Sequence, residues 1–205
     1  MSMTLYHVPG SRSVRTLWLL REMGATFDVH ELKLSLESLR DPAYLAISPL
    51  GRVPCLKDGD EIIFESGALT QYLCEKYNHP LMRAPGDPER GQWLQWLHYA
   101  ETMAVHAASL VQQVVFIPKE DRSKAVSDVE KRRLGQALSV LNKHLEGQDY
   151  VLKSGFSAVD TNVGYSVQLA KGFIPIDNWE NLVAYRERVI GRPAAQESLP
   201  ENMRS

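Results

Sequence analysis

Strand-like patterns occur almost only in the first part of this 205-residue chain, and this uneven distribution limits the possible folds more than any other feature. Near Asn78 the sequence becomes a bridge rich in turn residues, with the pairs His79-Pro80, Pro85-Gly86 and Asp87-Pro88. Beyond this bridge strand signals almost disappear. We therefore expect a domain of strands and helices over residues 1–80, a linker over 81–87 and an all-helical domain over 88–205, which is an α+β organisation.

The first domain begins with strand, turn, helix and strand. Residues 3–8 are rich in strand formers and end at Pro9-Gly10, after which apolar residues recur with helical spacing up to Gly24. Residues 27–30 alternate like a half-buried strand that residues 31–34 could extend, which would complete a β-α-β unit.

Two further strands are predicted over residues 53–56 and 61–64. They flank the pair Asp58-Gly59, which is a strong hairpin signal, so the two strands should be antiparallel neighbours. Ser66 then caps a helix that runs to about Tyr77.

Several helices are expected in the second domain. Asp87-Pro88, with the aspartate as N-cap, opens a long helix. A second helix covers about residues 121–145, and a third starts at the capping box Ser157–Asp160. The last helices lie between residues 179 and 199, and the polar residues 196–205 are expected to fray.

Charge and composition exclude several classes of function. The chain has 23 Lys and Arg residues against 25 Asp and Glu residues, so it has no general attraction for phosphate backbones or anionic lipid, and nucleic acid is not an expected partner. No stretch approaches 18 uninterrupted apolar residues, which argues against a membrane span. The start of the chain lacks the pattern of a signal peptide and the two cysteines lie far apart, so we expect a reducing, cytoplasmic compartment.

Three segments combine special backbone with polar groups, and the first is Pro9–Ser13, where a strand turns into a helix. Backbone N–H groups and the positive end of the helix dipole meet at such a terminus, which favours an anion or a thiolate. Alternatively, Ser11 or Ser13 simply caps the helix.

The second segment is Arg52–Cys55, where Pro54 interrupts the start of an apolar strand. Proline has no N–H, so it belongs at a strand edge or beginning. A cis bond before Pro54 would expose the backbone groups of Val53 for pairing with an extended peptide. Alternatively, Pro54 is an ordinary trans proline and does not indicate a binding site.

The third segment is Phe64–Leu69, where another strand runs into a helix. A ligand carboxylate could bind the N–H and hydroxyl of Ser66, and Glu65 could accept an ammonium group; alternatively, the segment is only a good helix cap. In a β-α-β-β-α sheet both helix N-termini and the proline strand can face one groove, and this shared geometry favours a binding site.

Other chemistry finds little support. His98 and His106 share a helix without a cluster of metal-binding side chains, so no metal site is expected. Cys55 and Cys74 are interpreted as buried, inert thiols. Glycine-rich dinucleotide loops, Walker loops and the hydrolase pattern Gly-x-Ser-x-Gly are absent.

Taken together, the motifs resemble the glutathione S-transferase superfamily, in the family's order and over nearly the whole chain. The segments that carry the resemblance are Pro9–Ser11, Ser48–Pro54, Glu65–Leu73, Ser157–Asp160, Trp179–Tyr185 and Arg192–Ala194. The Ser11–Arg15 turn, which reads Ser-Arg-Ser-x-Arg, is followed by Leu17–Leu20 and also resembles a bacterial and fungal, serine-type subgroup.

The resemblance implies an α+β protein with an N-terminal thioredoxin-like β-α-β-α-β-β-α domain that binds glutathione, followed by an all-α bundle that supplies most of the electrophile pocket. The implied activity is that of a glutathione transferase in detoxification. Such an enzyme uses glutathione as its co-substrate and activates the glutathione thiolate for attack on small hydrophobic electrophiles. No metal is implied. The alternatives are a non-catalytic binding or regulatory protein of this fold and a glutathione-dependent peroxidase or isomerase.

The resemblance also implies a homodimer. A long helix with apolar residues on more than one face agrees with a dimer, unless both faces are buried within one subunit. These apolar residues include Trp93, Leu94, Trp96 and Leu97.

Carried over position by position, the resemblance implies that Val53 pairs with the cysteinyl backbone of glutathione in front of a cis Pro54. Glu65 and Ser66 would hold the γ-glutamyl end. Arg52 is placed for the glycyl carboxylate, where a guanidinium can form a bidentate contact. The electrophile pocket would be lined by Tyr99, Met103 and His106.

The catalytic group stays open at this stage. A redox protein of this fold would need a cysteine motif at the first helix, where this chain has Ser11–Ser13, so the attacking sulfur must come from the ligand. Ser11 matches the serine of serine-type classes, and Tyr6 lies near the place of the tyrosine in tyrosine-type classes. Cysteine-type classes would carry the cysteine at Arg12 and are disfavoured. The candidates for stabilising the thiolate are therefore Ser11, Ser13, Tyr6 and Arg12.

Overall fold

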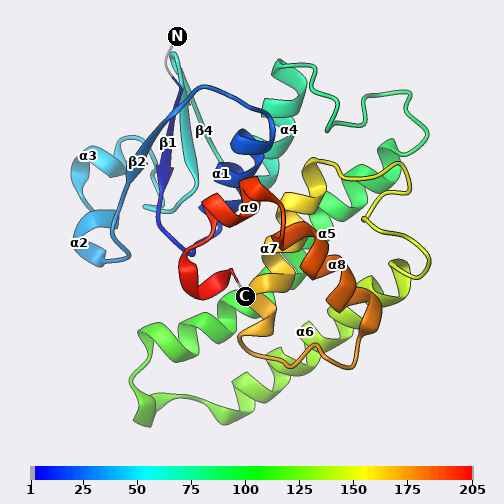
Figure 1. Cartoon of the computed structure of the whole chain (residues 1–205). Helices are drawn as coiled ribbons and strands as arrows, with labels where there is room; N and C mark the ends of the chain where they lie inside the picture. Colours follow the sequence, from blue (N-terminus) through cyan, green and yellow to red (C-terminus); the bar gives the residue numbers. More distant parts are fainter. Residues whose placement is uncertain (1–2, 205) are drawn as a thin grey trace. The chain divides into compact units, whose positions relative to one another are not determined.

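The computed structural model describes residues 3–204 and is shown as a ribbon in Figure 1. The chain forms two compact units. Unit 1 contains the residues up to Ala84 together with those from Gly191 onward, and unit 2 contains Pro85–Ile190. The predicted change from a domain of strands and helices to an all-helical architecture is confirmed. The return of the chain to unit 1 at Gly191 differs from the helical domain that we predicted over residues 88–205.

Unit 1 is built on a four-stranded sheet in the order β2-β1-β3-β4. The strands are β1 (Met3–His7), β2 (Asp28–Glu31), β3 (Cys55–Asp58) and β4 (Glu61–Phe64). β2 runs parallel to β1, whereas β3 is antiparallel to both β1 and β4. The hairpin predicted at Asp58-Gly59 joins β3 to β4, and Gly59 has the positive φ of 63° that such turns require.

One face of β1 forms the core of unit 1 with α1 (Ser13–Glu22). Leu5 and His7 are buried, whereas Tyr6 on the other face is partly exposed, as strand alternation demands. α1 buries every residue from Ser13 to Leu20 and contacts β1, α4 (Ser66–Lys76) and α9 (Pro193–Ser198). β2 is wrongly predicted as half-buried: all four of its residues are exposed, because it is the edge strand.

The C-terminal segment packs against α1 and therefore belongs to unit 1. Arg192 donates two hydrogen bonds of 2.7 Å each to the carboxylate of Glu22. Arg21 donates to Oγ of Ser198 at 2.9 Å, and Ser198 is buried. These contacts hold part of the segment 196–205 that we expected to fray; its last residue lies outside the described residues.

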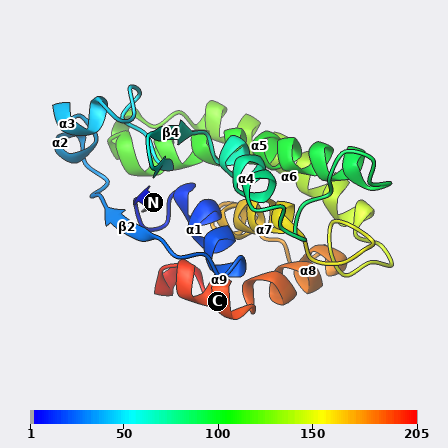
Figure 2. The ribbon, with the colours of Figure 1, turned by 90° about the horizontal axis from the view of Figure 1, so that it is seen from above.

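Unit 2 is helical. Its main helices are α5 (Arg90–Val111), α6 (Lys124–His144), α7 (Ala158–Lys171) and α8 (Glu180–Ile190). α7 is almost completely buried and contacts α5 and α8, between which Figure 2 shows it. The predicted capping box is present, because Oδ2 of Asp160 accepts a hydrogen bond of 2.8 Å from the N–H of Ser157.

Several helix boundaries differ from the prediction. α5 begins at Arg90 with Glu89 as N-cap, because Oδ1 of Asp87 accepts the N–H of Glu89 in a turn that precedes the helix. α6 begins three residues later than expected, since Ser123 is its N-cap.

Short helical turns were not predicted in detail, since three to five residues are too few to show a periodic pattern. They are α2 (Leu36–Leu39), α3 (Pro42–Leu45), a π-helical turn at Gln112–Phe116, and 3-10 turns at Lys119–Asp121 and Glu201–Met203. Between residues 3 and 204, no helix combines the length and apolar character that crossing a membrane requires.

Candidate functional site

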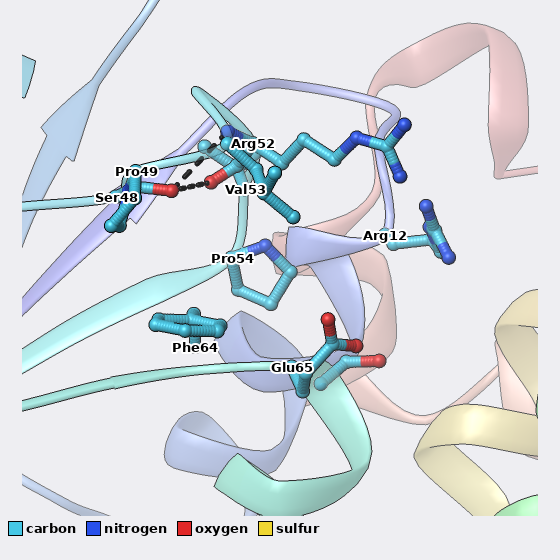
Figure 3. A pocket seen from close by; sticks show the side chains of 10 residues that line it. Arg12, Ser48, Pro49, Arg52, Val53, Pro54, Phe64 and Glu65 are labelled. Atoms are coloured by element: carbon cyan, nitrogen blue, oxygen red, sulfur yellow. Dashed lines mark hydrogen bonds between the residues drawn. The ribbon is translucent and has the colours of Figure 1, made fainter. Parts of the chain in front are cut away.

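A cavity of about 220 Å³ in unit 1 brings together most of the residues that we predicted to bind a ligand. The loop before β3, the junction between β4 and α4, and the start of α1 contribute to its lining (Figure 3). The lining residues are Arg12, Ser48, Pro49, Leu50, Arg52, Val53, Pro54, Phe64, Glu65 and Ser66.

The loop before β3 is fixed by two hydroxyl groups that the sequence analysis did not single out. The carbonyl oxygen of Arg52 accepts a hydrogen bond from Tyr44 Oη at 2.7 Å. It also accepts one from Ser48 Oγ at 2.9 Å, and the N–H of Arg52 donates to Ser48 (Figure 3). Burial raises the pKa of Tyr44 to about 12, so its hydroxyl remains a donor. A Cβ atom at Gly51, where φ is 59°, would lie 2.2 Å from the carbonyl oxygen of Leu39, so the loop requires glycine.

This fixed loop leaves main-chain groups of Val53 available. The bond between Val53 and Pro54 is cis, and β3 begins only at Cys55, two residues later than predicted. Within residues 3–204, neither the N–H nor the C=O of Val53 makes a hydrogen bond. Such a pair of groups is suited to an extended peptide that adds alongside the strand.

Charges of both signs line the cavity. In Figure 3 the guanidinium groups of Arg12 and Arg52 point to the same side, with the carboxylate of Glu65 below them in this view. In the described part of the chain, the side chains of Arg52 and Glu65 form no hydrogen bond or ion pair. The arrangement fits a ligand that carries carboxylates and an ammonium group.

The junction between β4 and α4 is held by a buried arginine to which the sequence analysis assigned no role of its own. Nη1 of Arg15, which is fully buried, donates a hydrogen bond of 3.0 Å to Oγ of Ser66. Ser66, which we predicted as the cap, is instead the first helical residue, and the N-cap is Glu65 with a φ of 77°. A positive φ costs a residue other than glycine about 1–3 kcal/mol, and such backbone clusters at ligand sites.

The junction between β1 and α1 contains a chain of hydrogen-bonded side chains. Oγ of Ser11 lies 2.8 Å from Oγ of Ser13, which lies 2.7 Å from Nδ1 of His7. Ser13 and His7 are buried, whereas Ser11 is partly exposed. Burial, aided by the charge of Arg21, lowers the pKa of His7 to about 4, so the imidazole is neutral near pH 7. Neither serine is the N-cap, because Arg12 occupies that position without a side-chain cap bond.

Tyr6 is surrounded by other rings. Its ring centroid lies 5.1 Å from that of His30 and 5.6 Å from that of Tyr44. Tyr6, Ser11 and Ser13 are not among the residues that line the cavity, so of the four catalytic candidates the structure places only Arg12 in its wall.

The three residues carried over for the electrophile all lie on α5 in unit 2. The hydroxyl of Tyr99 donates to the carbonyl oxygen of Ala137 at 3.1 Å, and Nδ1 of His106 lies 2.7 Å from Oε2 of Glu130. Met103 is fully buried. Their role toward an electrophile stays a prediction.

Both cysteines are buried free thiols, as predicted. Burial raises the pKa of Cys55 to about 11 and that of Cys74 to about 12, so neither is a thiolate near neutral pH. Across residues 3–204, no group of three or more His, Cys, Asp or Glu side chains is arranged to hold a metal ion.

Two family models match the chain: "Glutathione S-transferase, N-terminal domain" over residues 1–75 and "Glutathione S-transferase, C-terminal domain" over residues 106–193. Among curated proteins, glutathione S-transferase F10 of Arabidopsis thaliana is 33% identical over 167 residues, which cover 78% of this chain and 77% of the relative. Glutathione S-transferase 3 of Zea mays is 29% identical over 205 residues, which cover 95% of this chain and 92% of the relative.

Solved structures share the fold over nearly the full length. A glutathione transferase from Methylococcus capsulatus has a TM-score of 0.83 at 26% identity and covers 96% of each chain. One from Pseudomonas putida, solved with glutathione disulfide bound, has a TM-score of 0.87 at 24% identity and covers 98% of this chain and 91% of that chain. From the matched families and relatives, in agreement with the fold, we conclude that this chain belongs to the glutathione S-transferase family.

Proposed function

We propose that this protein is a glutathione transferase that activates the thiol of bound glutathione for attack on small hydrophobic electrophiles. The observation that carries the proposal is the available main-chain pair of Val53, in one cavity with charges of both signs. Glutathione fits this set, because it is an extended peptide with two carboxylates and one ammonium group. The names of the relatives and the glutathione disulfide bound to the Pseudomonas putida protein support the same ligand.

The cavity suggests a position for each part of the ligand. The cysteinyl backbone pairs with Val53, and the glycyl carboxylate meets the guanidinium of Arg52. At the other end, Glu65 accepts the ammonium group and Ser66 binds the γ-glutamyl carboxylate through its hydroxyl. Arg12 adds a second positive charge, which attracts the negatively charged ligand.

We assign thiol activation to Ser11. A free thiol has a pKa of about 8.5 and is mostly protonated at pH 7, whereas the thiolate is the nucleophile. A hydroxyl that donates to sulfur favours the charged form, and the N-terminal dipole of α1 acts in the same direction. Ser11 is preferred over Ser13 because Ser13 is fully buried, and over Tyr6 because Ser11 directly precedes the cavity residue Arg12.

The reaction then follows from the thiolate. The thiol proton leaves to solvent, and a sulfur electron pair forms a bond to the electrophilic carbon. With an aryl halide, the halide departs with the electrons of the carbon–halogen bond. The protein's contribution is to bind the peptide, hold the sulfur near Ser11 and stabilise its negative charge.

Retention on immobilised glutathione together with turnover of chlorodinitrobenzene tests the proposal. Ser11→Ala should move the pH–rate profile of kcat/KM to higher pH while glutathione affinity stays nearly the same. Binding without turnover would favour a non-catalytic binding protein, and peroxide reduction or isomerisation without conjugation would favour a glutathione-dependent peroxidase or isomerase. If Ser11→Ala, Ser13→Ala and Tyr6→Phe all leave the profile unchanged, backbone N–H groups or Arg12 must stabilise the thiolate.

The homodimer and the cytoplasmic location remain predictions from the resemblance and the sequence. Trp93, Trp96 and Leu97 are buried within the single chain, so they no longer argue for a dimer. Sedimentation as a single species with the mass of one chain at micromolar concentration would reject the dimer.

A further inference from the structure

The hydroxyl of Ser11 is the outer end of a hydrogen-bonded chain that leads into the core of unit 1. From Ser11 the chain continues to Oγ of Ser13 at 2.8 Å and then to Nδ1 of His7 at 2.7 Å. His7 is 4% exposed, and its side chain makes no other hydrogen bond among residues 3–204. Among these residues, the hydrogen bonding of the imidazole therefore runs through Ser13.

The donors and acceptors around Ser13 can be counted. A hydroxyl has one hydrogen and two lone pairs, and the N–H of Val8 occupies one lone pair at 3.1 Å. The carbonyl oxygen of Val8 is the most distant neighbour, at 3.2 Å against 2.7 Å for Nδ1 of His7 and 2.8 Å for Oγ of Ser11, so we assign the hydrogen of Ser13 to one of the two shorter contacts. The shorter contacts to His7 and Ser11 therefore use the remaining lone pair and the hydrogen, in one of two orders.

The order decides what Ser11 offers to a ligand. If Ser13 accepts from His7, it donates its hydrogen to Ser11. Oγ of Ser11 then accepts both this hydrogen and the N–H of Ser13 at 3.2 Å, so its own hydrogen must be donated outward. In the reverse order Ser11 donates inward to Ser13 and presents a lone pair to the ligand, which repels a thiolate.

We propose that His7 is a positioning residue whose Nδ1–H tautomer donates to Ser13 and thereby directs the hydroxyl of Ser11 toward the sulfur of glutathione. This inference rests on the proposed function of Ser11. The proposed role of Ser11 requires the Nδ1–H tautomer, because the opposite order of donors and acceptors turns the hydrogen of Ser11 inward to Ser13. Hydrogen bonds that all donate from His7 toward Ser11 also polarise one another, which makes the hydroxyl of Ser11 a stronger donor.

The tautomer can be measured without glutathione. Nitrogen-15 NMR of the full chain labelled at its six histidines distinguishes a protonated Nδ1 from a protonated Nε2, and His7→Asn identifies the His7 signals by their loss. A protonated Nδ1 at pH 7 supports the proposal. A protonated Nε2 overturns it, whatever the activity of the protein.

The effect on the ligand is measured by ultraviolet titration of the thiolate of bound glutathione. His7→Leu and Ser13→Ala should raise the thiol pKa by about one unit, a tenfold loss of thiolate below the pKa, with glutathione affinity nearly unchanged. His7→Asn should restore most of the loss, because its amide N–H can occupy the place of Nδ1–H. His7→Gln replaces His7→Leu if that variant fails to fold.

Leu5→Ala is the matched control, because Leu5 is fully buried on the same face of β1 as His7 and takes no part in the hydrogen bonds that link His7, Ser13 and Ser11. It should lower stability and leave the thiol pKa unchanged. Equal thiol pKa values in wild type, His7→Leu and Ser13→Ala, with a raised value in Ser11→Ala, would overturn the role of His7 alone. An unchanged value in Ser11→Ala would instead overturn the assignment of Ser11 and hence the proposed activation.

Discussion

Two strand-to-helix junctions of unit 1 have the same sequence pattern and different chemistry. We name the segment His7–Ser13 the first junction and the segment Phe64–Ser66 the second junction. In each, a buried basic side chain contacts a serine hydroxyl: His7 contacts Ser13 in the first, and Arg15 contacts Ser66 in the second. The second junction lines the cavity, whereas the first reaches it only through Arg12.

The difference lies in what the basic side chain can do. A guanidinium only donates, so Ser66 always accepts from Arg15, whereas a neutral imidazole donates or accepts according to its tautomer. Substitutions at the second junction should therefore change glutathione affinity, and substitutions at the first should change thiol ionisation.

The largest expected effect is a loss of folding stability at low pH that comes from the first junction. Burial, with the charge of Arg21 adding to it, lowers the pKa of His7 from 6.5 to about 4. The unfolded chain then binds the proton more readily, so the contribution of His7 is fully present above pH 6.5 and is lost as the pH falls toward 4. The difference amounts to about 3 kcal/mol.

Urea unfolding at neutral pH and near pH 4 measures this loss. His7→Leu should lose about 3 kcal/mol less than wild type between the two conditions, because it removes the titrating group. His98→Leu, at an exposed histidine, is the control and should behave like wild type. Equal losses in wild type and His7→Leu would show that the first junction does not titrate.

Next in size is the effect of Gly51→Ala on the loop that faces the second junction. The new Cβ atom would meet the backbone oxygen of Leu39, and overpacking of this kind costs about 1–3 kcal/mol, here at the upper end because backbone must move. Gly24→Ala is the matched control, since Gly24 has a similar φ of 61° with no atom within 4 Å. Thermal unfolding and glutathione titration should show a larger loss for Gly51→Ala than for Gly24→Ala; equal losses would contradict the close approach.

Arg52→Ala should weaken glutathione binding by about 1.5–3 kcal/mol, through loss of a charge-assisted hydrogen bond. The thiol pKa of bound glutathione should stay unchanged, since Arg52 belongs to the binding wall. Lys57→Ala removes the same charge from an exposed position on β3 outside the cavity and should leave affinity unchanged in calorimetric titration. If both variants weaken glutathione binding equally, Arg52 acts only through the overall charge of the protein and not through a direct contact with the ligand.

The smallest expected effect separates the two serines directly. Ser66→Ala should weaken glutathione binding by about 1 kcal/mol with no shift of the thiol pKa. Ser13→Ala should shift the thiol pKa with little change in affinity. For each variant, a calorimetric titration measures affinity and an ultraviolet titration measures the thiol pKa. The contrast between the junctions is lost if both variants change the same quantity.

Unchanged glutathione affinity in both Ser66→Ala and Arg52→Ala would show that glutathione does not bind in the cavity.

Local signals in the sequence were sufficient for the sheet, the hairpin at Asp58-Gly59 and the segments that line the cavity. Each depends on neighbours along the chain, such as the proline at 54 or the strand end before Ser66. His7 and Arg15 could not be predicted as site residues, because their importance comes from burial and from partners that only the folded chain brings near. The exposure of β2 and the return of residues 191–205 to unit 1 depend likewise on tertiary packing.

A crystal structure of the protein with glutathione tests the central claim most directly. We expect the cysteinyl backbone of glutathione to pair with the N–H and C=O of Val53, and the hydroxyl of Ser11 to be the side-chain hydroxyl nearest to the sulfur. Glutathione bound outside this cavity, or its sulfur held closer to Tyr6 than to Ser11, would contradict the account.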